Sequence, residues 1–314
     1  MKRRIGNTDL EVFPLALGGN TFGWTSSEAE SFAVLDAFVA AGGNFIDTAD
    51  VYSAWAPGNR GGESEVILGR WLKARKNRDR VVIGTKVGQL AGSAGLAPRT
   101  IRAAAEASLR RLQVDTVDLY YAHIDDRATP LADSLGAFDA LVREGKVRYL
   151  AASQYTAPRL EEALAISKQN GLARYVALQT HYSLVHREGY EGALAAVCAR
   201  ENVSCIPFWA LAKGFLTGKY RAGTQVESAR QEGASAFLDA RGLRVLSALD
   251  AIGAARGAPV AAVSLAWLLA QEAVAVPLAS ARIAAQLEDL LPVATLELTA
   301  EDLRQLTEAS TSAA

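Results

Sequence analysis

The feature that most constrains this chain is a series of short runs of β-branched and aliphatic residues, which recur along its length. The runs cover residues 14–18, 44–48, 81–86, 117–123, 147–152, 175–180, 203–207 and 274–278. Most begin about 30 residues after the previous run, which is the length of a strand and a returning helix. The spacing therefore predicts eight strands that alternate with helices.

The segments between these runs carry helical signals. Ser27 and Glu30 have the spacing of a capping box at the start of one segment, and Gly42 follows its end. Pro98 suits the first turn of another segment with an apolar stripe. Further helices are expected over residues 133–144 and 300–309, and a buried helix is expected over 258–270.

Alternating strands and helices require a parallel sheet, because a parallel connection needs a crossover helix. A doubly wound dinucleotide-binding sheet carries Gly-x-Gly-x-x-Gly directly after its first strand. Here Gly18-Gly19-Asn20-Thr21-Phe22-Gly23 follows that strand and lacks the spacing. Eight strands and a core of about 250 residues instead match a closed barrel. We therefore predict an α/β fold, a parallel eight-stranded (β/α)8 TIM barrel.

Three segments fall outside the eight units. Residues 2–13 contain turn residues between two short apolar pieces, which predicts an N-terminal hairpin closing one barrel end. Residues 218–236 form a long polar segment, a length typical of a functional lid or of a disordered loop. The end of the chain predicts extra C-terminal helices. No linker interrupts the alternation, so residues 1–314 are expected to form one domain.

Composition excludes several classes of function. The 314 residues carry 33 Lys and Arg against 34 Asp and Glu, which gives no electrostatic reason to expect nucleic acid or an anionic membrane as a partner. The first 11 residues contain no apolar signal sequence, and two cysteines indicate a reducing compartment, so a cytoplasmic protein is expected. No Cys or His cluster has metal-ligand spacing.

Polar side chains follow three successive strands. Asp47 and Tyr52 come after the second run, Lys86 ends the third and His123 ends the fourth. The carboxyl ends of barrel strands meet at one mouth. A neighbouring ammonium lowers the pKa of a tyrosine, and a carboxylate keeps a buried lysine charged. This set can protonate a carbonyl oxygen, but any reduction needs a hydride from a cofactor.

These segments make the chain resemble the aldo-keto reductases over essentially its whole length. The most specific pieces are Gly6-Asn7-Thr8-Asp9-Leu10, Asn44-Phe45-Ile46-Asp47-Thr48-Ala49-Asp50-Val51-Tyr52 and Thr85-Lys86-Val87-Gly88. The resemblance implies an enzyme that reduces an aldehyde or ketone to an alcohol with NADPH. It also implies that Tyr52 is the general acid, that Lys86 and Asp47 tune it, and that His123 orients the substrate.

The resemblance further implies a set of cofactor-binding residues. Ser153, Gln154 and Gln179 are expected to hold the nicotinamide amide, with Gln154 in the place of a usual Asn. Phe208 takes the position of the ring that stacks on the nicotinamide. Arg282 can hold a 2′-phosphate and so favours NADP over NAD. The remaining contacts expected are Leu211, Lys213 and Gly214 near the phosphates, and Ser280 and Gln286 on either side of Arg282.

Two further segments depart from the family pattern. Trp209-Ala210-Leu211 replaces Ser-Pro-Leu, which removes a hydroxyl near the pyrophosphate. Leu290 takes the place of a common Asn that contacts the adenine.

The substrate is a small carbonyl compound whose identity these motifs leave open. Trp24, Trp55 and Trp209 are candidates for an aromatic wall around the pocket mouth. The chain after the last strand lacks the extended loop that closes over the substrate in the steroid-reducing branch, which implies an open, permissive pocket.

Two alternatives remain at this point. The chain also resembles potassium-channel β subunits, so it could be an NADP(H)-binding regulatory subunit with slow turnover. Alternatively, Lys86 could form a Schiff base in a lyase.

Overall fold

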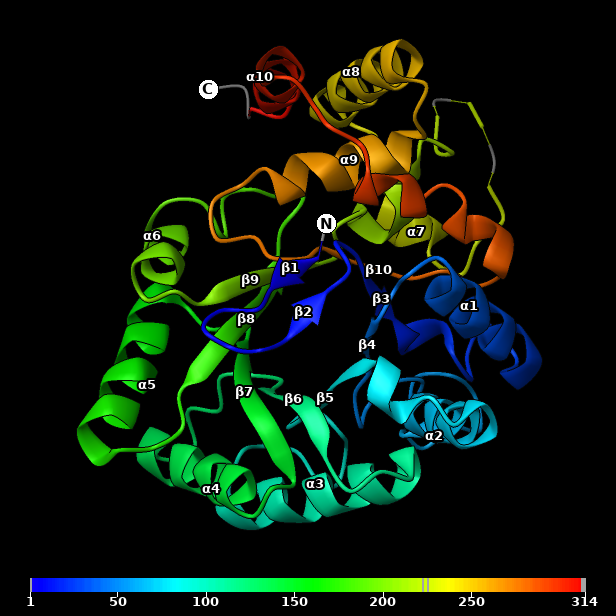
Figure 1. Ribbon diagram of the computed structural model, residues 1–314. Coiled ribbons are helices and arrows are strands. Elements are labelled where there is room, and N and C mark those ends of the chain that lie inside the picture. The colour runs from blue at the N-terminus through cyan, green and yellow to red at the C-terminus, as the bar shows by residue number, and fades with distance from the viewer. Residues whose placement is uncertain (1, 222, 225, 312–314) are drawn as a thin grey trace.

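The computed structural model describes residues 2–221, 223, 224 and 226–311. Its main sheet has eight parallel strands in the order β10-β3-β4-β5-β6-β7-β8-β9, with helices around the outside (Figure 1). The strands are β3 (Ala16–Gly18), β4 (Phe45–Asp47), β5 (Val82–Val87), β6 (Val117–Ala122), β7 (Val147–Ser153), β8 (Tyr175–His181), β9 (Ser204–Phe208) and β10 (Leu278–Ala279).

The segment before β10 closes the sheet against β9. The Cys205 amide donates to the carbonyl of Ala273 at 2.7 Å, and the Cys205 carbonyl accepts from the amide of Ala275 at 2.9 Å. The eight strands therefore form a barrel, which confirms the predicted (β/α)8 fold.

The predicted last strand is shorter than expected. The sequence suggested residues 274–278, but only Leu278 and Ala279 form a ladder, with Ala16 and Leu17, and Val274 makes an isolated bridge. Pro277 explains the break, because it has no amide hydrogen to donate to a neighbouring strand.

Helices connect the strands and follow the last of them. They are α1 (Glu28–Ala40), α2 (Glu63–Arg75), α3 (Pro98–Leu112), α4 (Leu131–Arg143), α5 (Ala157–Asn170), α6 (Ala193–Arg200), α7 (Gln231–Ser235), α8 (Ala240–Arg256), α9 (Val260–Leu269) and α10 (Ala300–Ala309). Ser27 and Glu30 form the predicted capping box of α1. The helix expected over 133–144 instead begins at Leu131, directly after Pro130.

Alternation along the strands separates two hydrophobic layers. Phe45, Leu119 and Tyr121 belong to a cluster inside the barrel. Ile46 and Tyr120 belong to a larger cluster between the strands and the helices. Because side chains of a strand alternate between its faces, residues two apart share the inside of the barrel. This rule decides which polar side chains can meet at the barrel mouth.

The predicted hairpin, β1 (Arg3–Arg4) and β2 (Glu11–Val12), covers one end of the barrel (Figure 1). It inserts Ile5, Leu10 and Val12 into the inner cluster. Arg148 of β7 donates to both carboxylate oxygens of Asp9 at 2.8 Å, which fastens the hairpin to the barrel. The opposite end of the barrel is left for a site.

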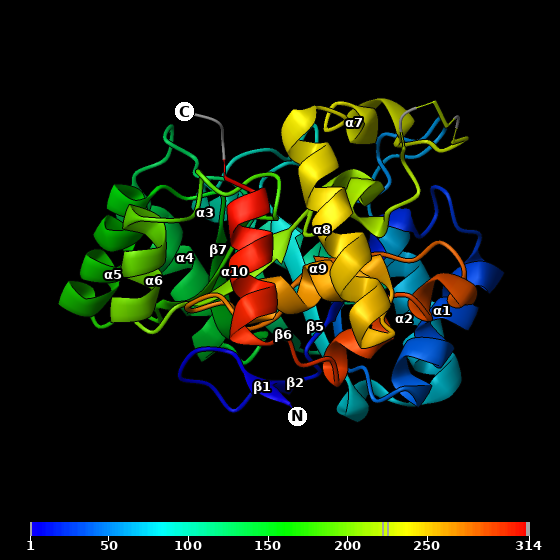
Figure 2. The same ribbon diagram turned by 90° about the horizontal axis from the view of Figure 1, so that it is seen from above.

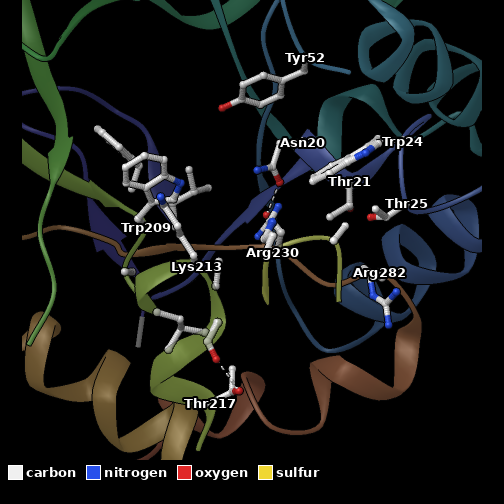
Figure 3. Close-up of a pocket in the computed structure, with 18 of the residues that line it drawn as sticks. Asn20, Thr21, Trp24, Thr25, Tyr52, Trp209, Lys213, Thr217, Arg230 and Arg282 are labelled. Atoms are coloured by element: carbon white, nitrogen blue, oxygen red, sulfur yellow. Dashed lines mark hydrogen bonds between the residues drawn. The ribbon is translucent and has the colours of Figure 1, made fainter. Parts of the chain in front are cut away.

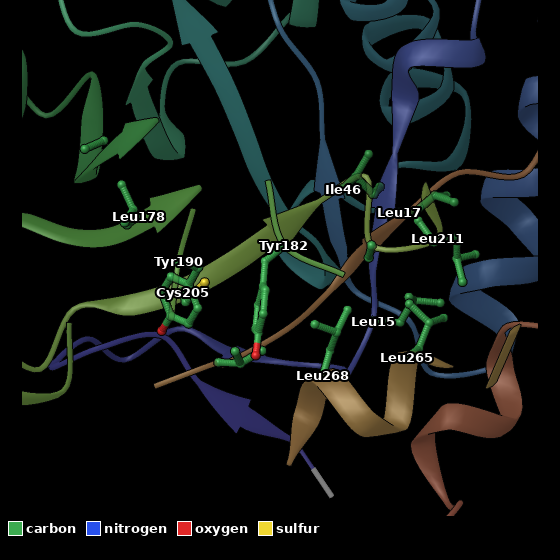
Figure 4. Packing of buried hydrophobic residues seen from close by; sticks show 14 of the residues in the cluster. Leu15, Leu17, Ile46, Leu178, Tyr182, Tyr190, Cys205, Leu211, Leu265 and Leu268 are labelled. Atoms are coloured by element: carbon green, nitrogen blue, oxygen red, sulfur yellow. The ribbon is translucent and has the colours of Figure 1, made fainter. Parts of the chain in front are cut away.

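Helix α9 is the buried helix expected over 258–270. Its Leu265 and Leu268 pack in the outer cluster with Leu15 and Leu17 of the first strand region (Figure 4). Among the described residues, no helix on its own has the length and apolar character needed to cross a membrane. Helices α8 and α9 reach that threshold only as a pair, and the pair is bent by 98°.

The described part of segment 218–236 lies at the end of the barrel opposite the hairpin. Figure 2 shows α7, which belongs to this segment, on the far side of the molecule from β1 and β2. The preceding 3-10 turn, η3 (Ala212–Thr217), packs against α7. The segment is therefore placed beside the carboxyl ends of the strands.

Helices α2 and α3 meet at Gly69. A methyl group at Gly69 would lie 2.2 Å from the Arg111 carbonyl oxygen. We expect Gly69→Ala to lower the free energy of unfolding by about 1–3 kcal/mol, because the backbone of α3 must move. Urea unfolding measures this change.

Gly136 of α4 is the matched control, since a methyl group there meets no atom within 4 Å. Gly136→Ala should raise the free energy of unfolding by about 0.5–1 kcal/mol through helix propensity alone. Equal effects of the two substitutions would show that the close contact at Gly69 does not matter.

Candidate active site

Polar side chains from the ends of several strands lie at the open mouth of the barrel. Asp47 lies two residues after Phe45, and His123 lies two residues after Tyr121, so both continue an inward-facing row. Lys86 follows the same rule on β5, four residues after the inward-facing Val82. The alternation, together with the parallel register, therefore places all three at one end.

Tyr52 reaches this group from the loop after β4. The Lys86 ammonium donates to the Tyr52 hydroxyl at 2.8 Å, to Asp47 Oδ1 at 2.5 Å and to the Thr48 carbonyl at 2.7 Å. The Tyr52 hydroxyl donates to Asp47 Oδ1 at 3.2 Å. Asp47 and Lys86 are fully buried. The structure therefore brings Tyr52, Lys86 and Asp47 into one hydrogen-bonded cluster.

The pKa of Tyr52 in this cluster shifts in the direction opposite to the one that the sequence analysis predicted. Burial lowers the pKa of Lys86, while the charge of Asp47 opposes that shift. For Tyr52, burial and then the charge of Asp47 raise the pKa well above 10. The predicted lowering of the Tyr52 pKa is therefore wrong: the pKa is raised, and the phenol keeps its proton at neutral pH.

The Lys86 geometry also bears on the lyase alternative. All three ammonium hydrogens have acceptors, and the side chain has no exposed surface. A Schiff base needs a free amine that a substrate can reach. The arrangement does not favour that reaction.

His123 lies beside Tyr52, with 6.2 Å between their ring centroids. Burial and then the charge of Lys86 lower the pKa of His123 well below 6.5, so the imidazole is neutral at physiological pH. Its Nδ1 is buried without a hydrogen-bond partner. Only Nε2 is therefore placed to contact a molecule in the cleft.

A cleft with a volume of about 540 Å³ opens above Tyr52 and His123. It runs across the carboxyl ends of the strands, with Tyr52 and Arg282 towards opposite ends and Arg230 between them in the view of Figure 3. Its lining includes the predicted residues Trp24, Tyr52, Trp55, His123, Ser153, Gln154, Gln179, Phe208, Leu211, Lys213, Gly214, Ser280, Arg282 and Gln286. Lys86 and Asp47 lie behind Tyr52 and do not line it.

The three expected amide-binding residues lie next to this cluster. Gln179 donates to Asp47 Oδ2 at 2.9 Å, so part of its amide is already used. Gln154 donates to the His123 carbonyl at 3.1 Å and has a left-handed backbone with φ of 61°. Ser153 is buried at the end of β7. Gln154 lines the cleft, although its amide nitrogen is used by the His123 carbonyl.

The chain after Phe208 makes a tight turn. Trp209, Ala212 and Lys213 all have left-handed φ values, of 49°, 47° and 58°. Non-glycine residues in this region store backbone strain, which gathers at functional sites. The Lys213 ammonium lies 4.6 Å from the centre of the Trp209 ring. This turn directs backbone and a cation into the cleft.

The far end of the cleft is formed after β10. Ser280 donates to Asn20 Oδ1 at 2.6 Å. The Arg282 amide donates to Gln286 Oε1 at 2.8 Å, and the Arg282 side chain is exposed. The structure therefore places Ser280, Arg282 and Gln286 in the lining of the same cleft.

Trp24 and Trp55 flank the Tyr52 end of the cleft. Their rings meet edge to face at 5.6 Å, and Trp55 lies 6.1 Å from the Tyr52 ring. Trp55 is also 48% exposed, which is unusual for so large an apolar side chain. Trp209 lines the cleft as well. The structure therefore places Trp24, Trp55 and Trp209 along the lining of the cleft, and the first two lie beside Tyr52.

Arg230 is a lining residue that the sequence reasoning did not identify. It comes from segment 218–236, and its guanidinium lies 5.6 Å from the centre of the Trp24 ring. Its Nη2 is buried without a hydrogen-bond partner, and burial lowers its pKa. The sequence offered only the length of the segment as a signal, because no motif marks this arginine.

The aldo/keto reductase family model matches residues 14–311. The chain belongs to the aldo/keto reductase family. The match spans the barrel and every residue of the Tyr52 cluster. Within the described part of this aldo/keto reductase, no group of three or more His, Cys, Asp or Glu side chains is placed to hold a metal ion.

Relatives within the family cover nearly the whole chain. Protein tas of Escherichia coli is 33% identical, over 96% of this chain and 95% of that protein. Norsolorinic acid reductase B of Aspergillus parasiticus is 30% identical, over 95% of this chain and 80% of that protein. Aryl-alcohol dehydrogenase GME11368 of Pestalotiopsis microspora is 29% identical, over 96% and 79%. This aldo/keto reductase is therefore similar to oxidoreductases along its length.

The buried pair Lys86 and Asp47 leads to a stability prediction. Lys86→Met or Asp47→Leu alone leaves an uncompensated buried charge, which should cost about 3–5 kcal/mol. The double variant should be more stable than the sum of the two single effects predicts. Urea unfolding of all four proteins measures the coupling free energy.

The exposed pair Arg304 and Glu301 on α10 serves as the control. Its coupling should stay below about 1 kcal/mol, because water screens exposed charges. If the losses of unfolding free energy in Lys86→Met and Asp47→Leu simply add in the double variant, the two side chains do not form a coupled buried ion pair.

Proposed function

We propose that this chain is an NADPH-dependent carbonyl reductase, which converts an aldehyde or ketone to an alcohol. The observation that carries the proposal is the hydroxyl of Tyr52. This hydroxyl accepts a hydrogen bond from the Lys86 ammonium at 2.8 Å. It lies at one end of a long cleft, and Arg282 lines the other end. A proton donor and a dinucleotide-sized groove thus share one barrel mouth.

The cleft suits NADPH on chemical grounds. Cations occur along it at Lys213, Arg230 and Arg282. Arg230 Nη2 is buried without a partner, and a guanidinium in that position is stabilised by an anion such as a phosphate. Phe208 and Gln179 also line the cleft, where they offer an aromatic face and an amide. When bound there, NADPH supplies a hydride for the carbonyl carbon.

The chain supplies the proton. Tyr52 is neutral at physiological pH, so its hydroxyl is available to protonate the oxygen of the substrate as negative charge develops on it. The phenolate left behind is stabilised by the Lys86 ammonium, which Asp47 keeps in place. His123 Nε2, when it carries the imidazole proton, donates a hydrogen bond that orients the same oxygen.

The substrate class follows from the walls around Tyr52. Trp24 and Trp55 present a large apolar surface beside the hydroxyl, and Trp55 is half exposed. A flat or bulky apolar group bonded to the carbonyl carbon buries most area there. We therefore favour aryl aldehydes and ketones over small or charged carbonyl compounds. The names of the aryl-alcohol and norsolorinic acid enzymes agree with this choice.

Tyr52→Phe tests the proton donor. We expect kcat for reduction to fall by about 10²–10⁴-fold, because the general acid is lost while the ring and the cleft remain. NADPH binding, followed by tryptophan fluorescence, should change little. Tyr149→Phe is the control, since Tyr149 lies at the hairpin end of the barrel and donates to Asp9. Full activity in Tyr52→Phe would remove Tyr52 from this role.

Two arginine variants test the cofactor. Arg282→Ala should raise the Kd for NADPH about 10- to 100-fold and leave that for NADH unchanged, because only NADPH carries a 2′-phosphate. Arg230→Ala should weaken both cofactors by similar factors, since both carry the pyrophosphate. Tryptophan fluorescence titrations give all four values. Equal losses of NADPH and NADH affinity in Arg282→Ala would contradict the assignment of Arg282.

A further inference from the structure

The loop from β4 to Tyr52 contains a buried carboxyl group that the mechanism above does not use. Asp50 is 1% exposed, and neither of its carboxyl oxygens has a hydrogen-bond partner. Its backbone amide donates to the Lys86 carbonyl at 3.3 Å, so it lies directly beside the catalytic lysine. An unpaired carboxylate is unfavourable in a buried position, so the presence of this group needs a physical explanation.

The neighbouring carboxylates are well supplied with donors. Asp47 accepts from Lys86, and Glu65 of α2 accepts from Thr85 at 2.6 Å and from Arg111 of α3 at 2.6 Å. Three carboxyl groups thus share two cations. The third carboxyl group, in the loop, is the one without a donor, so it is the one that holds a proton most readily.

The charged groups that act on Asp50 come from α2, α3 and β5. Glu65 on α2 and Arg111 on α3 act on it in opposite senses, and Lys86 on β5 favours its ionised form. Tyr120 on β6 is buried with no partner for its hydroxyl, and burial keeps it neutral by raising its pKa. No further cation from these elements stabilises the carboxylate.

The balance favours a protonated carboxyl group. Burial, followed by the charge of Glu65, raises the pKa of Asp50 to about 7. Arg111, the amide of Val51 and Lys86 oppose that shift. The Val51 amide approaches the carboxyl group but does not reach hydrogen-bond geometry.

We propose that Asp50 is a positioning residue: its carboxyl group, buried without a hydrogen-bond donor in the loop that pairs with the Lys86 backbone, adds a negative charge when it ionises, and this charge keeps Lys86 charged. The inference rests on the proposed function, because Lys86 acts there through Tyr52. Asp50 is not among the residues that line the cleft. It acts on the electrostatics of the Tyr52 cluster from the side away from the cleft.

The sign of the effect follows from the charges. An ionised Asp50 disfavours loss of a proton from Lys86 and from Tyr52. Asp50→Asn preserves the shape of the protonated form and removes this charge. The alkaline limb of the pH profile for reduction should therefore move to lower pH in Asp50→Asn, by about one pH unit.

The first test needs no turnover. The folded protein binds the Asp50 proton up to about pH 7, whereas an unfolded Asp releases it near pH 4. Stability of the native protein therefore falls as pH rises between these values, and the loss is constant above pH 7. The Tm of Asp50→Asn relative to the native protein should rise from pH 5 to pH 7 and then level off.

Coupling to Lys86 is tested in the Lys86→Met background. Without the ammonium, Asp50 keeps its proton to higher pH, so the Tm difference should go on rising above pH 7. Asp118→Asn is the matched control, because Asp118 is a buried carboxylate paired with Arg78 and Arg148 at the other end of β6. The Tm difference between Asp118→Asn and its parent should have the same pH dependence in the native and Lys86→Met backgrounds.

The second test follows the rate of reduction from pH 5 to pH 10. The ratio of the Asp50→Asn rate to the native rate should fall above pH 7, whereas the Asp118→Asn ratio should be the same at every pH. A constant ratio for Asp50→Asn, or a Tm difference that does not depend on pH, overturns the proposal. Absence of any carbonyl reduction would overturn the proposed function, and the Tm experiment would still decide the titration of Asp50 and its coupling to Lys86.

Discussion

The ammonium of Lys86 is the constraint on which the rest of the site depends. A charged lysine with no exposed surface persists inside a barrel only when its hydrogens are fully used and its charge is balanced. Asp47, the Thr48 carbonyl and Tyr52 meet the first need. The balance of charge extends further, because Asp50 and Glu65 also act on this ammonium. The charge state of Lys86 therefore depends on carboxyl groups that lie behind the cleft, where β5 packs against helices α2 and α3.

The barrel has two unlike ends, and this difference makes the site possible. The hairpin fills one end with Ile5, Leu10 and Val12, which shield the inner cluster from water. At the other end the inward rows finish in polar side chains, and segment 218–236 brings Arg230 over them. Water is thus excluded from below Lys86, while the mouth stays open to ligands. A low dielectric on one side strengthens the electrostatic interactions of the Tyr52 cluster.

Much of the fold and part of the site followed from local patterns. The runs of apolar residues gave the eight strands, and Ser27, Pro98 and residues 300–309 gave helices where the structure has them. The last strand was placed too early, because Pro277 prevents a ladder that the apolar composition suggests. The positions of Asp47, Tyr52, Lys86 and His123 after successive strands were sufficient to predict that the four side chains lie at one mouth of the barrel. The position of Arg230 in the cleft could not be predicted, because a long loop without periodicity gives no indication of where its side chains lie in the fold.

What the sequence by itself determined is the alternation of strands and helices and the inward parity of Asp47, Lys86 and His123. These depend on periods of 2 and 3.6 residues, which are local properties of the chain. Only the tertiary structure decided the number of donors that each carboxyl group receives. Asp47 and Asp50 stand three residues apart in one motif, yet Asp47 accepts from Lys86, Tyr52 and Gln179, whereas Asp50 has no partner. Proton affinity depends on the solvation and charges around a group, and those come from residues distant in sequence.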